Sequence, residues 1–218
     1  MAGMQCIRRS TRTDAAAISA LRLSAYQAAR EFTVVKPDAL AWSDLDDVAV
    51  VLAAWDESDR AVSTMQGRVF DTRSEAEADL ECDIPLDAAE FPALGLGKGA
   101  TRPERHAAGV HSLIRYHFLS AVDPSIKAVL GVVFAGAPRL RLMETLGYEF
   151  RTPARYWYTD LRPERPTLVA CLPAARIAAA RAALFETVRP VLADYPWHGP
   201  PLRISAAGEV SRASGWPR

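Results

Sequence analysis

Glycine occupies every second position from 95 to 99, and a basic loop and an apolar helical pattern follow directly. Successive side chains of a strand point to opposite faces of a sheet, so Gly95, Gly97 and Gly99 would leave one face without side chains. A bare strand face can admit an extended ligand. A β-bulge or close packing against a helix is the structural alternative, because a glycine suits a bulge and a missing side chain lets another element approach.

The loop after these glycines has the features of an anion-binding site. The first N–H groups of the following helix have no partner within the helix, and the helix dipole places positive charge there. Arg102 and Arg105 can add charge-assisted hydrogen bonds, or they can be solvated surface residues. Strand and loop together indicate a long ligand, with a phosphate at the loop and an extended arm along the glycines.

Acidic and imidazole side chains near this segment are candidate proton acceptors. A general base has to lie within hydrogen-bond reach of its proton, directly or through one water. Glu90 is the acidic residue nearest to the strand, with Glu81 and Asp83 before it, and His111 lies near the start of the helix. Each of them has an ordinary alternative as a solvated side chain.

Alternating strands and helices must position these residues. We expect strands near residues 4–10, 47–56, 61–70, 93–101, 128–136, 148–161 and 166–172, and helices near 15–30, 109–121, 138–147 and 173–189. The last helix should stop at Pro190, because a proline ring has no N–H to donate. This order predicts an α/β (α+β) fold, in which a mixed central sheet has helices on both faces.

Composition and cysteine spacing exclude several classes of function. The 26 basic and 26 acidic side chains cancel, so no global charge attracts nucleic acid or a membrane surface. Cys6, Cys82 and Cys171 form no CxxC pair, which predicts reduced core thiols and no metal site. No segment approaches the roughly 20 apolar residues of a membrane span, and no apolar leader stands at the start. We therefore expect a cytoplasmic protein.

The stretch LGKGATRPERHAAGVHSLI resembles the central strand, pyrophosphate loop and helix of the GCN5-related N-acyltransferase (GNAT) superfamily, which commonly read like ELGRLAVHPEYRGKGIGSKLL. Leu96-Gly97-Lys98 takes the place of Leu-Gly-Arg, Pro103-Glu104 that of Pro-Glu, and Gly109-Val110 that of Gly-Ile. Further on, Leu146-Gly147-Tyr148 is similar to the Leu-Gly-Phe that ends the family's second signature. The resemblance covers about residues 5–161. It implies a GNAT-like acyltransferase core at 1–165, with a strand, helix and tail at 166–218 packed on it.

The resemblance implies an N-acyltransferase that moves an acyl group from a pantetheine thioester to the primary amine of an amino acid or other small molecule. The donor would be acyl-CoA or the acyl-phosphopantetheine of acyl carrier protein. Residues expected to hold it are Gly97, Lys98, Gly99, Arg102, Arg105, His106, Ala107, Ala108, Gly109 and Val110. Glu90, His111 and Tyr148 are the candidate catalytic residues, and backbone N–H groups around the glycines can stabilise the oxyanion.

The sequence departs from the family pattern at residues that matter for catalysis. Met143 replaces a tyrosine that often protonates the departing thiolate, and Gly95 stands where a glutamate often serves as base. Tyr148, Tyr156 and Tyr158 are nearby alternatives for the missing acid. These departures keep two other functions open: a GNAT-like ligand-binding protein without catalysis, and an ordinary acetyl-CoA-dependent acetyltransferase.

The loop and the end of the chain indicate possible partners. The loop is less glycine-rich than the family's, with Ala107 at its first glycine and His111 at its last small residue. In this it resembles the N-acyl amino acid synthases, relatives of the acyl-homoserine-lactone synthases, whose donor is carried by acyl carrier protein. The helix from Pro173 and the tail either cover a sheet edge or form a homodimer, and the sequence does not choose between these.

Overall fold

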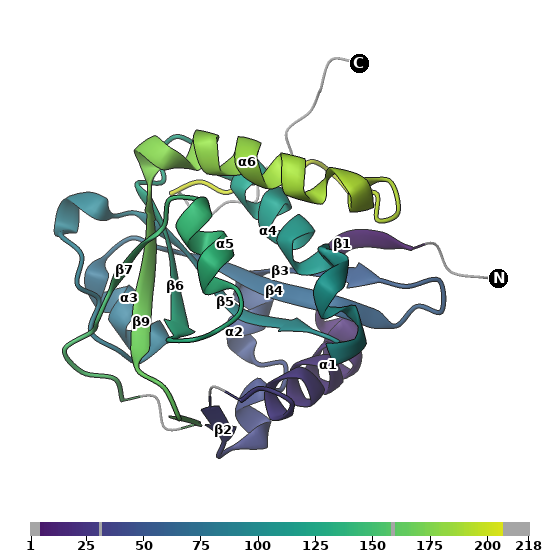
Figure 1. Cartoon of the computed structure of the whole chain (residues 1–218), viewed down its shortest axis with the longest axis horizontal. Coiled ribbons are helices and arrows are strands. Elements are labelled where there is room, and N and C mark those ends of the chain that lie inside the picture. The colour runs from purple at the N-terminus through teal and green to yellow at the C-terminus, as the bar shows by residue number, and fades with distance from the viewer. Residues whose placement is uncertain (1–4, 31, 158–159, 207–218) are drawn as a thin grey trace.

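The structure is a computed structural model of the 218-residue chain, and it describes residues 5–30, 32–157 and 160–206. In these residues a seven-stranded mixed sheet has the order β1-β3-β4-β5-β6-β9-β7 (Figure 1). Its strands are β1 (Cys6–Ser10), β3 (Val50–Trp55), β4 (Ala61–Phe70), β5 (Ala93–Thr101), β6 (Ala128–Phe134), β7 (Glu149–Arg151) and β9 (Thr167–Pro173). A separate pair joins β2 (Phe32–Val34) to β8 (Leu161–Pro163).

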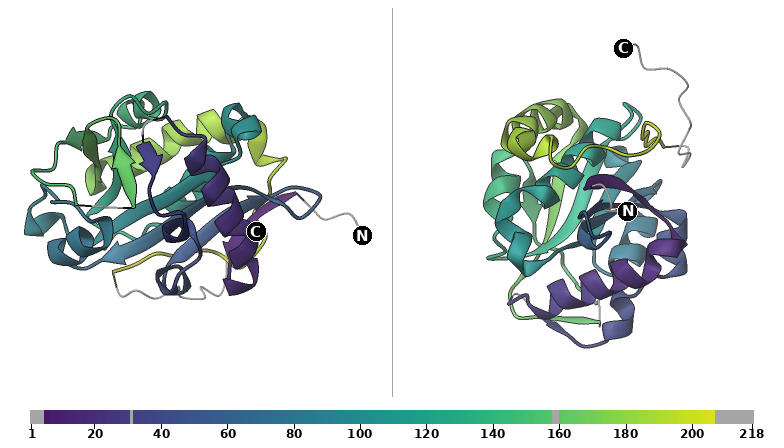
Figure 2. Two further views of the ribbon diagram at one scale, coloured as in Figure 1. Left: turned by 90° about the horizontal axis from the view of Figure 1, so that it is seen from below. Right: turned by 90° about the vertical axis from the view of Figure 1, so that its right-hand side faces the viewer.

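Helices cover both faces of the sheet, which confirms the predicted fold class. Helices α4 and α6 pack together over one face of the sheet, with α5 beside them. Helix α1 lies on the opposite face (Figure 2). The helices are α1 (Ala15–Gln27), α2 (Asp44–Val48), α3 (Arg73–Leu80), α4 (Val110–Ala121), α5 (Leu140–Thr145) and α6 (Ala174–Leu192). Short 3-10 turns are η1 (Arg12–Asp14), η2 (Pro37–Leu40), η3 (Ala88–Glu90) and η4 (Pro103–Ala108).

The apolar stripe of α4 explains why this helix lies across the sheet. Leu113, Ile114 and Phe118 are each fully buried against the side chains of Leu94 and Leu96 on β5. Their spacing of one, four and five residues places them on one side of a helix. Burying a side chain of this size stabilises the fold by about 1.5–3 kcal/mol, so α4 is fixed relative to β5.

Several elements differ from the sequence-based expectation. The pair β2–β8 and helices α2 and α3 lie in segments whose apolar residues follow neither helical nor strand periodicity clearly, and were not predicted. The last helix was expected to stop at Pro190 but continues to Leu192. A proline near a helix end removes one hydrogen bond while its φ still suits the helix. Val188 before it and Tyr195 after it are buried, and this packing holds the final turn.

A segment after α6 lies along the first strand. Ile7 in β1 donates its N–H to the carbonyl of Pro196 (2.9 Å) and accepts from the N–H of His198 (2.7 Å). Residues 196–198 therefore cover one edge of the sheet. The strand β9, from the segment expected to pack on the core, lies inside the central sheet between β6 and β7.

The three cysteines are buried and free, as expected of core thiols. Burial raises the pKa of Cys82 to about 12 and that of Cys171 to about 11, so both stay thiols. Among the helices of the described residues, none combines the length and apolarity that crossing a bilayer requires.

Candidate functional site

Strands β5 and β6 separate halfway along their length. They are parallel and paired only from Ala93 opposite Ala128 to Gly95 opposite Leu130. Beyond this point β5 stays paired with β4, and β6 stays paired with β9 as far as Phe134. On the β6 side of residues 96–99, the backbone groups of β5 therefore have no strand partner. The sheet opens as a V with its wide end toward α4 and α5.

A pocket lies between the diverging strands, and we call it the splay pocket. It has a volume of about 50 Å³, enough for a few water molecules or a carboxylate-sized group. Leu96, Gly97, Lys98 and Gly99 line one wall, and Gly131 of β6 lines the other. The helix side chains around it include those of Tyr26, His111, Arg115, Arg139 and Met143.

The sequence alone predicted that the three alternate glycines share one bare face of the strand. In the structure they do not. A β-bulge places Lys98 and Gly99 opposite a single residue of β4, and Lys98 takes a left-handed conformation (φ 46°). The extra residue turns Gly99 toward α4, where an added Cβ would lie 2.8 Å from Cε1 of His111. At Gly95 the space is filled by the ring of Phe70. The prediction is right for Gly97, whose face is open to at least 4 Å.

The predicted anion-binding loop leads into α4 as expected. Gly109 is the N-cap of this helix, with a left-handed φ of 72°, and Val110 behind it is buried. Arg102 ties the loop to the start of β4, since its Nε donates to the carbonyl of Ala61 (2.7 Å). Arg105 is exposed at the surface.

The remaining loop residues take their places around this turn. The ring of His106 is hydrogen-bonded to the carbonyl of Thr101 at 2.9 Å. Positions 107 and 108 are the last two residues of η4. Among the predicted donor-binding residues, Gly97, Lys98 and Gly99 line the splay pocket, and the others form the loop at its end.

His111 lies in the splay pocket, on the first turn of α4. Its Nδ1 is 3.3 Å from Oγ of Ser63, which donates to the carbonyl of Ala100 and has a second oxygen, Oγ1 of Thr101, at 2.8 Å. In the arrangement in which the Ser63 proton goes to the carbonyl of Ala100, the Ser63 oxygen accepts from Nδ1 and the lone pair of the imidazole is on Nε2. That nitrogen is sealed from solvent and has no partner in the described structure. Burial, together with the charges of Arg115 and Arg139, lowers the pKa of His111 to about 3.

The other two candidate catalytic residues lie outside the splay pocket. Glu90 is at the opposite end of β5, where its carboxylate accepts from the N–H of Asp87 (2.9 Å) and lies 3.5 Å from a nitrogen of Arg151. Tyr148 is a core residue, 5% exposed, and its hydroxyl accepts from Nη1 of Arg115 (3.0 Å). Tyr148 therefore reaches the splay pocket through Arg115. Tyr158 falls outside the described residues.

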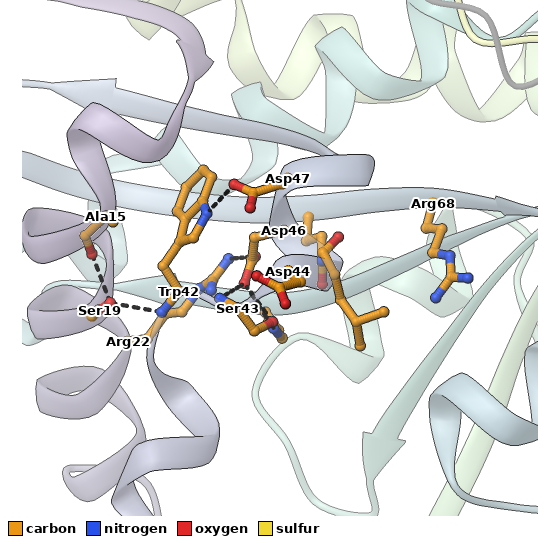
Figure 3. A network of polar contacts seen from close by, with 12 residues as sticks. Ala15, Ser19, Arg22, Trp42, Ser43, Asp44, Asp46, Asp47 and Arg68 are labelled. Carbon is orange, nitrogen blue, oxygen red and sulfur yellow. Dashed lines mark hydrogen bonds and ion pairs between the residues drawn. The ribbon is translucent and has the colours of Figure 1, made fainter.

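A buried ionic cluster beside the splay pocket was missed at the sequence level. The side chains of Arg22 of α1 and Asp46 of α2 are fully buried and form an ion pair at 2.6 Å (Figure 3). Nζ of Lys98 lies 2.9 Å from the other carboxylate oxygen. The N–H of Ser43 also donates to Asp46. These contacts lower the pKa of Asp46 to about 2 despite its burial. The signal in the sequence was a lone arginine on the apolar face of the first helix.

Lys98 connects this cluster to the splay pocket. Its side chain is 23% exposed and lines the pocket wall, while its ammonium group is held by Asp46. Burial and the nearby charge of Arg22 lower the pKa of Lys98. Figure 3 shows Arg22 directed from α1 toward Asp46, with Arg68 well apart from the cluster.

The acid–base groups present limit the chemistry of the site. Met143, in place of the family's tyrosine, lines the splay pocket and cannot donate a proton. Within the described residues, no acidic side chain lines this pocket. Nor do three His, Cys, Asp or Glu side chains of the described chain gather as a metal site requires. The site can therefore align reactants and offer backbone N–H groups, an imidazole and cationic side chains.

Comparisons of the fold find acyltransferases with this arrangement of strands. The CoA-dependent acyl-homoserine lactone synthase BjaI, solved with SAM and isopentyl-CoA, matches with a TM-score of 0.54 over 93% of this chain and 96% of its own, at 14% identity. FeeM, an N-acyl amino acid synthase from uncultured soil microbes, matches with a TM-score of 0.53 over 81% and 95%, at 12% identity.

A third similar structure has a protein substrate. It is an Escherichia coli N-acetyltransferase acting on an alanine of a ribosomal protein, with a TM-score of 0.53 over 78% of this chain and 94% of its own, at 16% identity. No family model matches the sequence, and the comparison with curated protein sequences finds no match. The comparisons therefore show that the chain has the GNAT acyltransferase fold, as its sequence led us to expect.

Proposed function

We propose that this chain, which has the fold of the GCN5-related N-acyltransferases, transfers an acyl group from a pantetheine thioester to the primary amine of a small molecule. The observation that carries the proposal is the opening between β5 and β6 after Gly95 and Leu130. An extended arm entering there would place its phosphate end at the loop before α4 and its thioester beside Gly97. Open space at Gly97 and the free backbone on the β6 side support this placement.

In the proposed reaction, the amine nitrogen attacks the thioester carbonyl, a C–N bond forms and the C–S bond breaks. Backbone N–H groups of the widened part of β5 would stabilise the oxyanion that develops on the carbonyl oxygen. The amine must lose a proton. Because burial holds the pKa of His111 at about 3, its imidazole can accept a hydrogen bond from the neutral amine through Nε2, and the proton itself goes to water. The departing thiolate takes up a proton, which a good leaving group with an ordinary pKa near 8.5 can obtain from water. Met143 need not act as an acid.

The size of the splay pocket favours a short acyl group. A cavity of about 50 Å³ is too small for a long alkyl chain unless neighbouring side chains move, because each methylene needs its own packing volume. We therefore expect acyl-CoA with a short chain to be a better donor than a long-chain thioester. Acyl carrier protein is the alternative donor. Arg105 is exposed on the loop, where its positive charge could bind this acidic carrier.

The second candidate function is ligand binding without catalysis. It is favoured by one observation, that Glu90 lies at the far end of β5 and is bound to Arg151. An assay of thiol release separates the two candidates. Acetyl-CoA, long-chain acyl-CoA and acyl carrier protein would each be tested against a pool of amino acids and other small amines. Thiol release that depends on both donor and amine supports the transferase, and binding without release supports the second candidate.

A further inference from the structure

The splay pocket carries an excess of positive charge. Lys98 and Arg115 line it, and within the described residues no carboxylate does. Charged groups enclosed by protein are costly unless an opposite charge or hydrogen bonds compensate them. The pocket therefore has the electrostatic character of a site for an anion.

Arg115 is the residue that most requires such an anion. It lies on the second turn of α4 and is 7% exposed, so its guanidinium is largely removed from bulk water. Its Nη1 donates to the hydroxyl of Tyr148 at 3.0 Å, and no carboxylate of the described residues lies within 4.0 Å. A guanidinium has five N–H donors. Most of them thus remain available toward the pocket that Arg115 lines.

The neighbouring buried arginine shows the contrast. Arg22 is also enclosed, but the carboxylate of Asp46 lies 2.6 Å from its Nη2. That carboxylate is shared with Lys98, so two cations face one anion. Nε and Nη1 of Arg22 have no partner among the described groups. Both walls of the splay pocket therefore retain net positive charge.

We infer that Arg115 binds a carboxylate carried by one of the two substrates, in the splay pocket between β5 and β6. A guanidinium matches a carboxylate with two parallel hydrogen bonds, and the pocket has room for a group of this size. The inference rests on the proposed acyl transfer. It deepens that function by selecting an acidic substrate over a polyamine, whose positive charges would be repelled.

The carboxylate can come from either side of the reaction. An amino acid acceptor has one beside its amine, and a dicarboxylic acyl group has one at its far end. The charge of a bound carboxylate would also offset the field that Arg115 exerts on His111, one of the causes of the low pKa of that imidazole. Recognition of the acidic group and activation of the amine would then be linked through the same pocket.

Calorimetric binding with two matched pairs of probes tests the inference without requiring turnover. Succinyl-CoA against butyryl-CoA isolates a carboxylate on the acyl group. N-acetyl-leucine against N-(3-methylbutyl)acetamide isolates one on the acceptor side. We expect the acidic member of one pair to bind about tenfold or more tightly, as a charge-assisted hydrogen bond implies.

Variants identify the residue responsible. Arg115→Met should abolish the preference, Arg115→Lys should reduce it, and Arg141→Met, at an exposed arginine of α5 outside the pocket, should keep it. If Arg115→Met does not fold, the Arg115→Lys comparison decides. Equal binding within both pairs, no binding of any probe, or an unchanged preference in the Arg115 variants would overturn the inference. Absence of thiol release with a preserved preference would instead overturn the proposed transferase activity.

Discussion

The imidazole of His111 is anchored to the hydroxyl of Ser63, with 3.3 Å between Nδ1 and Oγ, and its other nitrogen has no partner in the described structure. Ser63 is itself fully buried in β4. A strand hydroxyl thus fixes the orientation of a helix imidazole at the splay pocket. Because this contact holds the imidazole in a buried position, protonation of His111 should affect the stability of the fold, which can be measured.

We predict that the stability of the chain falls as the pH drops below about 6.5, the ordinary pKa of an unfolded histidine. Burial lowers the pKa of His111 to about 3 in the folded chain, so only the unfolded chain binds this proton between the two values. The free energy of unfolding then declines by up to about 1.4 kcal/mol per pH unit for one such group. Above pH 6.5 the group is neutral in both states and contributes no slope.

Urea unfolding between pH 4.5 and 7.5 measures this dependence. His111→Gln should remove the contribution of His111 to the slope of unfolding free energy against pH. The contribution of His117 should remain, because burial lowers the pKa of that residue to about 4. An identical slope in the wild-type chain and His111→Gln would contradict the prediction.

Substitutions at two of the strand glycines should have opposite consequences. Gly97→Val adds a side chain where the structure has open space, so we expect a folded protein of equal or higher melting temperature whose kcat/KM falls about a hundredfold through displaced substrate. Gly95→Ala would collide with the ring of Phe70 and should cost about 1–3 kcal/mol through overpacking. Thermal melts and thiol release on both variants test this. Full activity in Gly97→Val would contradict the proposed placement of the ligand on this face of β5.

Breaking the ion pair between Arg22 and Asp46 should be strongly destabilising. Both side chains have no exposed area, and Asp46→Asn would leave a buried guanidinium without its counter-ion, at a cost of about 3–5 kcal/mol. The double variant Arg22→Met with Asp46→Leu should regain part of this loss, because the buried guanidinium is removed together with its counter-ion and only Lys98, whose side chain is 23% exposed, loses its partner. Chemical denaturation of the single and double variants gives the coupling. Independent, additive effects would show that the pair does not act as a unit.

Arg105 is the better of the two loop arginines for testing recognition of the donor. Arg102 holds the carbonyl of Ala61, so its replacement would also disturb the loop. For Arg105→Glu we expect KM of the thioester to rise about three- to fivefold, an effect that salt should weaken since the site is exposed. Arg181→Glu, an exposed position on α6, is the matched control. A larger effect with acyl carrier protein than with acyl-CoA would identify the acidic carrier as donor.

Local patterns were enough to predict the elements that frame the site. The glycine strand, the basic loop and the stripe of Leu113, Ile114 and Phe118 identify β5 and α4, because strand alternation and helical spacing are properties of short segments. A β-bulge was one of the alternatives for these glycines, but its position and the turn of Gly99 away from Gly97 were not predictable in this way. The turn depends on one extra residue in β5 relative to β4, which is a property of two paired strands.

The long-range ion pair was also not predicted from the sequence. Arg22 and Asp46 are 24 positions apart, and neither belongs to a motif. Arg115 is a buried arginine beside the apolar stripe of α4, and its charge was the available sign of a polar function on this helix. Glu90 was favoured because it is close to the strand in sequence. In an extended strand, seven residues span about 23 Å, so proximity along the chain placed it at the wrong end.

The segment that runs beside β1 has a consequence for biosynthesis. Ile7 is synthesised long before Pro196 and His198, which complete its hydrogen bonds. Until then the outer backbone of the first strand is an unpaired template of the kind that recruits other strands. Chains terminated before residue 196 should therefore accumulate as insoluble material, even though every residue of the splay pocket has been synthesised.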